Sequence, residues 1–114
     1  MVPDETNAAV TGLDEEELSQ LQALFSSYPE IRKIILFGSR AKGTARKNSD
    51  IDLAVDGLES TLKIESLAME LDELSLPYHF DLQAMRAINN RSLLEHIERI
   101  GIVIYLGQTN YSPK

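Results

Sequence analysis

Short apolar segments of two different periods alternate along this chain of 114 residues. Runs typical of buried strands lie at 31–37, 51–55, 78–82 and 102–106. Between them, at 14–28, 62–74 and 93–100, apolar residues recur every three or four positions, as on one face of a helix. Strands and helices that alternate pack as layers, so we expect an α/β (α+β) fold with a small mixed sheet flanked by helices.

The ends of these segments indicate one domain. Asp14 followed by Glu17 is a helix-capping pattern, and Pro29 ends that helix. We expect a flexible leader at 1–12, a single domain at 13–108 and a frayed tail at 109–114. The stripe at 62–74 should face the core, and Met69 and Met85 are expected to fill gaps in it.

The composition excludes several classes of protein. Eighteen acidic residues against eleven basic ones give a net charge of −7, which disfavours direct nucleic-acid binding. Without cysteine there is no disulfide or thiolate metal site, and two histidines make a zinc site improbable. The apolar runs are far shorter than the roughly 20 residues that span a bilayer. We expect a cytoplasmic protein with no membrane partner.

Gly38 and Ser39 follow the strand at 31–37 directly. A glycine there lets the backbone turn sharply and approach a ligand, and the serine adds a hydroxyl donor, which suits phosphate oxygens. The alternative is an ordinary strand-ending turn. Gly38 and Gly43 have the glycine spacing of a P-loop, but no lysine follows Gly43, so we reject a P-loop nucleotide site.

A basic cluster follows the glycine turn. It places four of the eleven basic residues within eight positions: Arg40, Lys42, Arg46 and Lys47. In an acidic chain this local excess favours binding of a polyphosphate. The alternative is a solvated charged loop.

Asp50 and Asp52 begin the second strand. Residues two apart on a strand face the same side, roughly 6.5–7 Å apart between Cα atoms, whereas Ile51 and Leu53 face the core. Paired carboxylates repel each other unless a cation lies between them, and oxygen ligands suit Mg²⁺ or Mn²⁺. The alternative is a solvent-facing strand that happens to contain two aspartates.

Asp81 is a third candidate carboxylate, between Phe80 and Leu82 of the strand at 78–82. If this strand pairs with the one that contains Asp52, three carboxylates can hold two cations. Asp81 would then be the proton acceptor or the ligand nearest the nucleophile, and the alternative is a salt-bridged aspartate. His96, between Leu93 and Ile97 on the last helix, is expected at the surface or rim.

Three motifs together resemble the signature of the polymerase β-like nucleotidyltransferases: FGSRAKG at 37–43, SDIDL at 49–53 and FDL at 80–82. The short chain is similar to the minimal nucleotidyltransferase branch of that superfamily. The resemblance covers about 31–106. One departure is Lys42, where many relatives have arginine, so a planar two-pronged grip on phosphate is lost.

The resemblance implies a magnesium-dependent enzyme that moves a nucleoside monophosphate, AMP from ATP above all, to a hydroxyl. Gly38 and Ser39 would hold the triphosphate, and Asp50, Asp52 and Asp81 would bind two Mg²⁺ or Mn²⁺ ions. It also implies a small helical HEPN-domain partner that this protein inactivates as an antitoxin. Two alternatives stay open: a non-catalytic module that masks its partner, and a small-molecule modifier of the antibiotic type, against which the missing substrate domain argues.

Overall fold

Four strands form one mixed sheet in the order β3-β2-β1-β4 in the computed structural model. The structure describes residues 13–38, 50–58 and 60–107. The strands are β1 (Lys33–Phe37), β2 (Ile51–Asp56), β3 (Phe80–Ala84) and β4 (Ile102–Leu106). The helices are α2 (Glu15–Ser26), α4 (Thr61–Asp72) and α5 (Arg91–Ile100), and a 3₁₀ turn, η1 (Met85–Ala87), follows β3. The expected mixed sheet flanked by helices is confirmed.

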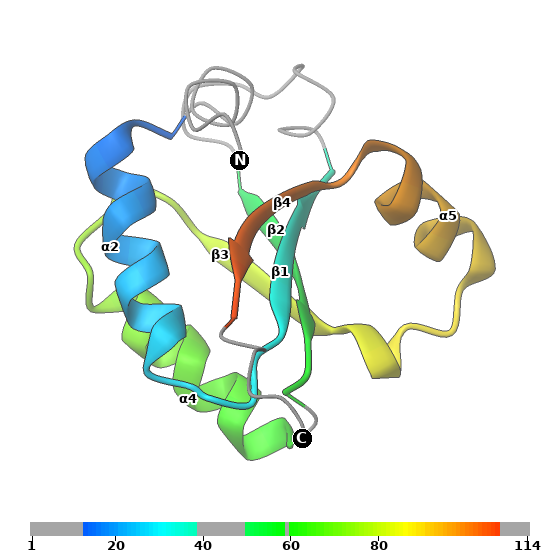
Figure 1. The fold of residues 1–114 in the computed structure, drawn as a ribbon, viewed down its shortest axis with the longest axis horizontal. Helices are drawn as coiled ribbons and strands as arrows, with labels where there is room; N and C mark the ends of the chain where they lie inside the picture. Colours follow the sequence, from blue (N-terminus) through cyan, green and yellow to red (C-terminus); the bar gives the residue numbers. More distant parts are fainter. Residues whose placement is uncertain (1–12, 39–49, 59, 108–114) are drawn as a thin grey trace, which may run out of the picture.

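The directions of the strands follow from their connections. β1 is antiparallel to both of its neighbours, β2 and β4, whereas β2 and β3 run parallel. A parallel pair needs a crossover, and α4 supplies it between β2 and β3. Figure 1 shows α2 and α4 on one face of the sheet and α5 on the other. β1 and β2 therefore lie in the middle of a three-layer molecule.

The start of α2 is fixed by the predicted capping pattern. The backbone N–H of Glu17 donates to the Asp14 carboxylate at 2.7 Å, and the Asp14 N–H donates back to the Glu17 carboxylate at 3.1 Å. Leu18, Leu21 and Phe25 then fall on one side of the helix and are buried against the sheet. The cap and the apolar spacing together place the first turn of α2 at one end of the sheet.

α4 confirms its predicted apolar stripe and corrects one expectation. Leu67 and Leu71 are buried, as their spacing predicts. Met69, which we expected in the core, is 65% exposed. It lies two residues from each buried leucine, roughly 200° around the helix axis, so its side chain points to solvent. Met85 does pack against a buried cluster, as expected.

Two apolar cores cover the two faces of the sheet. The larger one joins the sheet to α2 and α4 and includes Leu36, Leu53 and Leu71. The smaller one lies under α5 and contains Ile35, Phe37, Ala54, Ile88 and Ile97. Alternate residues of β1 and β2 thus belong to different cores, which fixes the register of both strands.

β3 begins two residues later than the predicted segment 78–82. Tyr78 is instead tied to the start of α2, where its hydroxyl donates to both Glu17 carboxylate oxygens, at 3.0 and 3.2 Å. Within the described ranges, no helix is both long and apolar enough to span a membrane.

Candidate active site

The ends of three neighbouring strands bring the predicted aspartates together. In the register of the sheet, Phe37 of β1 lies opposite Asp52 of β2, and Asp52 lies opposite Asp81 of β3. Adjacent strands are about 4.8 Å apart, so these three positions form a row roughly 10 Å long across the sheet. Asp50 precedes the first residue of β2 and is exposed. The expected pairing of the two aspartate strands is thus present.

The row faces α5. Phe37 belongs to the apolar core under that helix, and residues directly opposite each other in a sheet point to the same side. Leu53, next to Asp52, points into the other core under α2 and α4. Asp52 and Asp81 therefore lie on the side of the sheet that α5 covers only in part. Asp81 is exposed, because β3 is the edge strand.

Gly38 makes close backbone contact with the central carboxylate. It ends β1 with a φ of +82°, a conformation that L side chains rarely adopt. A Cβ atom built on Gly38 would lie 2.3 Å from Oδ2 of Asp52. Only glycine fits this turn while leaving the Asp52 side chain where it is, so the turn and the carboxylate form one unit.

The surroundings of Asp52 disfavour the charged form of its carboxyl group. Burial raises the pKa of its carboxyl above the ordinary value, and the negative charges of Asp81 and then of Asp50 raise this pKa further. Asp52 is therefore close enough to Asp81 and to Asp50 to be repelled by both. A cation between them would relieve this repulsion.

The donor set suits a hard divalent cation but does not enclose one. Carboxylate oxygens from Asp50, Asp52 and Asp81 are the ligands that Mg²⁺ and Mn²⁺ prefer. Among residues 13–38, 50–58 and 60–107, however, no three His, Asp or Glu side chains converge as a complete ligand group. Mg²⁺ is commonly held by one or two carboxylates plus substrate phosphates, and these residues fit that mode.

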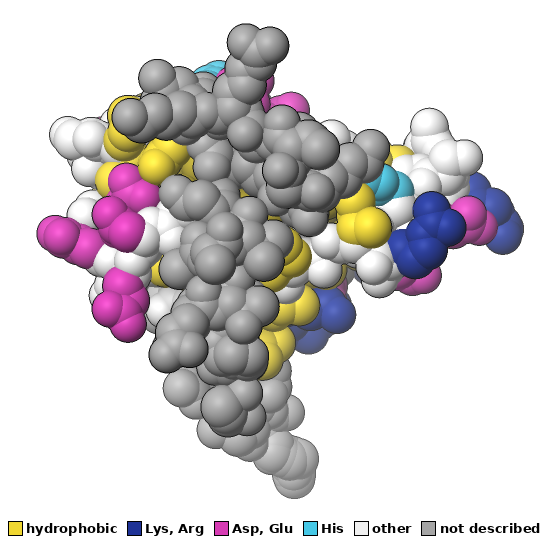
Figure 2. Space-filling model, turned by 90° about the horizontal axis from the view of Figure 1, so that it is seen from above, with side chains coloured by type: hydrophobic (Ala, Val, Ile, Leu, Met, Phe, Trp, Pro, Cys, Tyr) yellow, Lys and Arg dark blue, Asp and Glu magenta, His cyan; other side chains and the backbone are white. Residues whose placement is uncertain are grey.

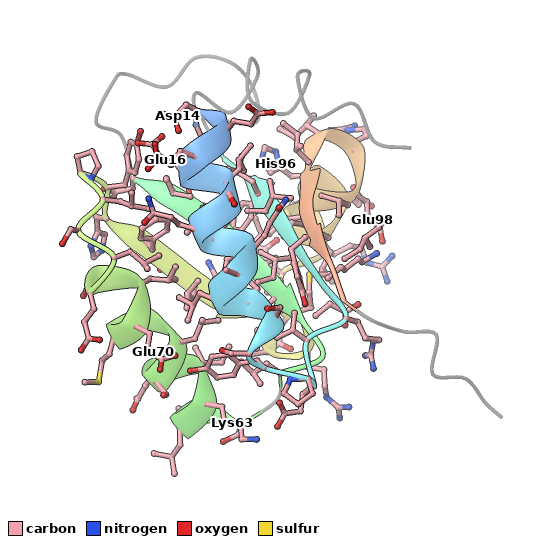
Figure 3. All side chains as sticks on the ribbon, turned by 60° about the vertical axis from the view of Figure 1, so that its left-hand side comes forward. Asp14, Glu16, Lys63, Glu70, His96 and Glu98 are labelled. Carbon is pink, nitrogen blue, oxygen red and sulfur yellow. The ribbon has the colours of Figure 1, made fainter. Side chains whose placement is uncertain are left out.

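The rest of the predicted nucleotide site lies outside the described residues. This applies to Ser39, Arg40, Lys42, Arg46 and Lys47. Around the described part, Figure 2 shows many acidic side chains on the side of α2, and most of the visible Lys and Arg on the side of α5. The first turn of α2 contributes three glutamates, and Figure 3 places Asp14 and Glu16 at that end of the molecule.

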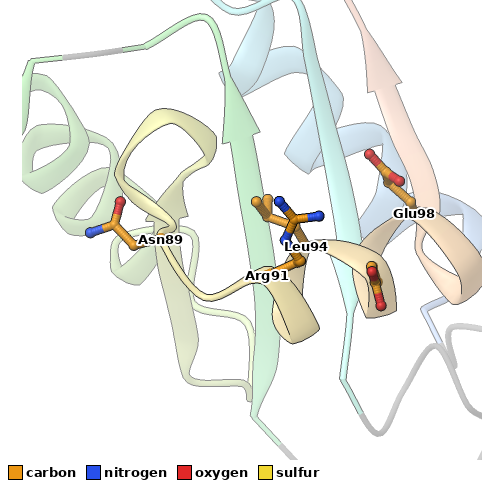
Figure 4. Close-up of a pocket in the computed structure, with 5 residues that line it drawn as sticks. Asn89, Arg91, Leu94 and Glu98 are labelled. Carbon is orange, nitrogen blue, oxygen red and sulfur yellow. The ribbon is translucent and has the colours of Figure 1, made fainter.

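A pocket of about 360 Å³ lies on α5 but contains none of the predicted site residues. Figure 4 shows its lining residues spread along the helix, and they are Asn89, Arg91, Leu94, Glu95 and Glu98. Two carboxylates against one guanidinium make it poorly suited to a polyphosphate.

Sequence reasoning included Phe37 in the buried strand and in the motif at 37–43, but gave this member of the row no place beside the aspartates. Its role follows from the strand register, which no single segment reveals. One signal in the sequence could have placed Phe37 in the site: it directly precedes Gly38, so it must lie beside the glycine turn. His96 of α5 packs edge-on against Phe37, with ring centroids 6.4 Å apart.

A glycine turn and carboxylates on two parallel strands, on a mixed sheet with helices on both faces, define a nucleotidyltransferase. Residues 19–110 match the family model described as "Polymerase beta, Nucleotidyltransferase". The chain belongs to this family and is a nucleotidyltransferase, which confirms what the motifs at 37–43, 49–53 and 80–82 indicate.

Relatives narrow the branch of the family. The chain is 31% identical over 101 residues to a probable protein adenylyltransferase MntA of Haemophilus influenzae, covering 87% of this chain and 88% of that protein. A crystal structure of a toxin–antitoxin with AMP-PNP matches with a TM-score of 0.64 and 29% identity, over 86% of this chain and 77% of the other. A tri-AMPylated Shewanella oneidensis HEPN toxin in complex with MNT antitoxin matches with a TM-score of 0.58 and 25% identity, over 86% and 73%.

Proposed function

We propose that this protein transfers AMP from ATP to a hydroxyl of a small HEPN-domain partner, and so acts as its antitoxin. The observation that supports this most directly is the row in which Asp52 lies opposite Asp81, beside the Gly38 turn. The similar proteins include an adenylyltransferase and an antitoxin bound to an AMPylated HEPN toxin, which supports the nucleotide and the partner. A protein that uses ATP in this way is expected in the cytoplasm.

The triphosphate binds at the end of β1. The backbone N–H groups of Gly38 and Ser39 donate to phosphate oxygens, and the Ser39 hydroxyl adds a donor. Four basic side chains that follow in the sequence offset the charge of the phosphates: Arg40, Lys42, Arg46 and Lys47. An acidic protein needs this local positive charge to hold an anionic substrate.

Asp50, Asp52 and Asp81 hold divalent cations, Mg²⁺ or Mn²⁺, when nucleotide is bound. These ions supply neutralisation of the charge that develops on the triphosphate during transfer. The Asp52 carboxylate, half-buried and next to Gly38, fixes the position of the α-phosphate relative to the end of β1.

Asp81 faces the acceptor. It lies on the edge strand and is exposed, so a hydroxyl of another protein can reach it without any rearrangement of the sheet. Its carboxylate accepts the hydroxyl proton as the new bond from oxygen to the α-phosphorus forms. The bond from that phosphorus to the bridging oxygen breaks, and pyrophosphate leaves with the electron pair.

The test is transfer of label from [α-³²P]ATP, with Mg²⁺, to a co-purified HEPN partner. We expect label on the partner with the wild-type protein and at least about a 100-fold loss with Asp52→Asn. Asp56→Asn is a matched control, because Asp56 lies on the same strand at its far end, in an exposed ion pair with Arg32. This control should transfer at the wild-type rate.

Two other results would contradict the proposal. If Asp52→Asn still silences the partner without transferring label, the protein is a masking module rather than a catalytic antitoxin. If label appears on a small molecule but never on the partner, it is a small-molecule modifier.

A further inference from the structure

We propose that His96 contacts the β- and γ-phosphates of the bound nucleotide and donates a hydrogen bond to the leaving pyrophosphate. This rests on the proposed function and assigns a further residue to the same site. His96 belongs to α5, 44 positions after Asp52 in the sequence. Figure 3 places it at the end of the molecule where α2 begins, which is also where β1 ends.

The contact with Phe37 fixes the place of His96 in the site. The two rings meet edge to face at 82°, and Phe37 is only 5% exposed, so its ring cannot move far. Phe37 lies opposite Asp52 and directly before Gly38. The imidazole is therefore one side chain away from both the phosphate-binding turn and the central carboxylate.

The imidazole is available to a ligand. His96 is half-buried, yet within the described part of the chain its ring nitrogens make neither a hydrogen bond nor an ion pair. A half-buried imidazole normally finds a partner for its polar nitrogens, because desolvating them without one is costly. A phosphate oxygen above Phe37 would supply that partner.

The order of the strands decides which part of the nucleotide His96 meets. Across the row, Asp81 and Phe37 lie on opposite sides of Asp52. In phosphoryl transfer the attacking oxygen and the leaving oxygen are roughly in line with the phosphorus between them. With the acceptor at Asp81, the leaving group points toward β1. His96 and Gly38 are at that side.

The charges of α2 and α5 also favour a triphosphate tail that points toward β1 and α5. The first turn of α2 contains three glutamates, whereas α5 contains two arginines and two glutamates and is neutral overall. Figure 2 likewise shows more Lys and Arg on the side of α5. A triphosphate tail that points toward α5 therefore meets less repulsion than one that points toward α2.

Two substitutions separate hydrogen bonding from packing. His96→Phe keeps an aromatic ring against Phe37 but removes the ring nitrogens, whereas His96→Gln keeps an N–H donor and removes the ring. We measure binding of α,β-methylene-ATP with Mg²⁺ by calorimetry. We expect His96→Phe to bind about tenfold more weakly or worse, and His96→Gln to bind more tightly than His96→Phe. The control Glu95→Gln, next along the helix but exposed, should bind as the wild type.

A second measurement holds even if a variant folds poorly. The chain has two histidines, so its NMR spectrum has two C2–H ring signals. The His96 signal is the one absent from His96→Phe, or from His96→Gln. In the wild-type protein it should shift when pyrophosphate and Mg²⁺ are added.

The outcomes are distinct. Wild-type affinity in His96→Phe, weaker binding in His96→Gln alone, or an unmoved His96 signal overturns the inference, since the ring would then serve only to pack on Phe37. Those results leave the proposed function intact. If the wild-type protein itself does not bind the ATP analogue with Mg²⁺, the proposed function fails, and the role of His96 fails with it.

Discussion

A single glycine connects the fold to the chemistry of this protein. Gly38 adopts a φ of +82° and leaves no room for a Cβ beside Asp52. The turn and the carboxylate therefore depend on each other: a side chain at position 38 would both strain the backbone and displace the oxygen that a cation needs. The position of the Asp52 carboxylate therefore depends on the left-handed backbone conformation of Gly38.

Gly38→Ala should reduce both stability and activity. A left-handed residue with a Cβ costs about 1–2 kcal/mol, and the displaced Asp52 carboxylate should lower transfer at least about 100-fold. Urea unfolding and the labelling assay measure the two effects. Gly101→Ala serves as a control for stability alone, because Gly101 is also crowded by neighbouring atoms but lies after α5. Wild-type transfer in Gly38→Ala would show that the turn does not position the carboxylate.

Asp52→Asn should stabilise the metal-free protein at neutral pH while it abolishes transfer. The pKa of Asp52 is raised in the folded state by burial and by Asp81 and Asp50. The folded state therefore binds this proton more tightly than the unfolded state does. The stability from that proton is complete below the unfolded pKa and is lost as pH rises through the folded pKa. Asparagine does not ionise, so the Asp52→Asn variant keeps its stability as the pH rises.

Urea denaturation in EDTA at several pH values measures this effect. The difference between Asp52→Asn and the wild type should be present at pH 7 and should shrink toward zero below the unfolded pKa. A variant less stable than the wild type at pH 7 would contradict a raised pKa for Asp52 in the folded state.

At the scale of elements, α4 acts as the crossover that brings Asp81 beside Asp52. Its position depends on the buried residues Leu67 and Leu71. It also depends on the Tyr28 hydroxyl, which donates to the Glu70 carboxylate at 2.6 Å and shares a hydrogen bond with the Ser66 hydroxyl at 3.2 Å. These contacts join α4 to the end of α2. A helix with no site residue of its own thus sets the geometry of the carboxylates.

Leu71→Ala should destabilise the protein by about 2–5 kcal/mol, since it leaves a cavity under the crossover helix. Met69→Ala, on the solvent side of the same helix, should change stability by less than about 0.5 kcal/mol. Chemical denaturation of both variants provides the comparison. Equal losses would mean that the buried stripe is not where the structure places it.

Local patterns predicted most of the elements because their causes are local. The Asp14–Glu17 cap, the stripe of α4 and the β-branched run of β1 each follow from residues within one segment. What could not be predicted is set by contacts between segments. Tyr78 leaves the strand pattern because Glu17, 61 positions away, accepts its hydroxyl. Met69 is a different case: it lies roughly 200° around the helix from Leu67 and from Leu71, so local helix geometry alone predicts its exposure, and our expectation of a core position was wrong.

The site was predictable in part for the same reason. Asp50 and Asp52 can be recognised as site candidates by their spacing, and Asp81 can be recognised by its apolar neighbours in the sequence. The pairing of β2 with β3, however, was only a condition in the sequence argument, and the place of His96 against Phe37 had no local signal. The first depends on which strands become neighbours, and the second on how α5 packs against β1.

For the whole molecule, the net charge of −7 means that free ATP is repelled, and the three carboxylates at the site add to this repulsion. We expect ATP in EDTA to bind at least about tenfold more weakly than ATP with Mg²⁺. Mg²⁺ alone should also bind weakly, since the described carboxylates do not form a complete ligand group without phosphate oxygens. Calorimetric titrations of each combination test this. Equal affinity for ATP with and without Mg²⁺ would contradict it.

The parallel pairing of β2 and β3 has a practical consequence. Gly38 and Asp52 belong to one hairpin, whereas Asp81 arrives only after the crossover and the exposed loop that contains Ser75. A chain divided at that loop would yield two halves, neither with the full set of aspartates. Catalysis would then report on whether the halves had rejoined, so the molecule is suited to engineering as a two-piece proximity sensor.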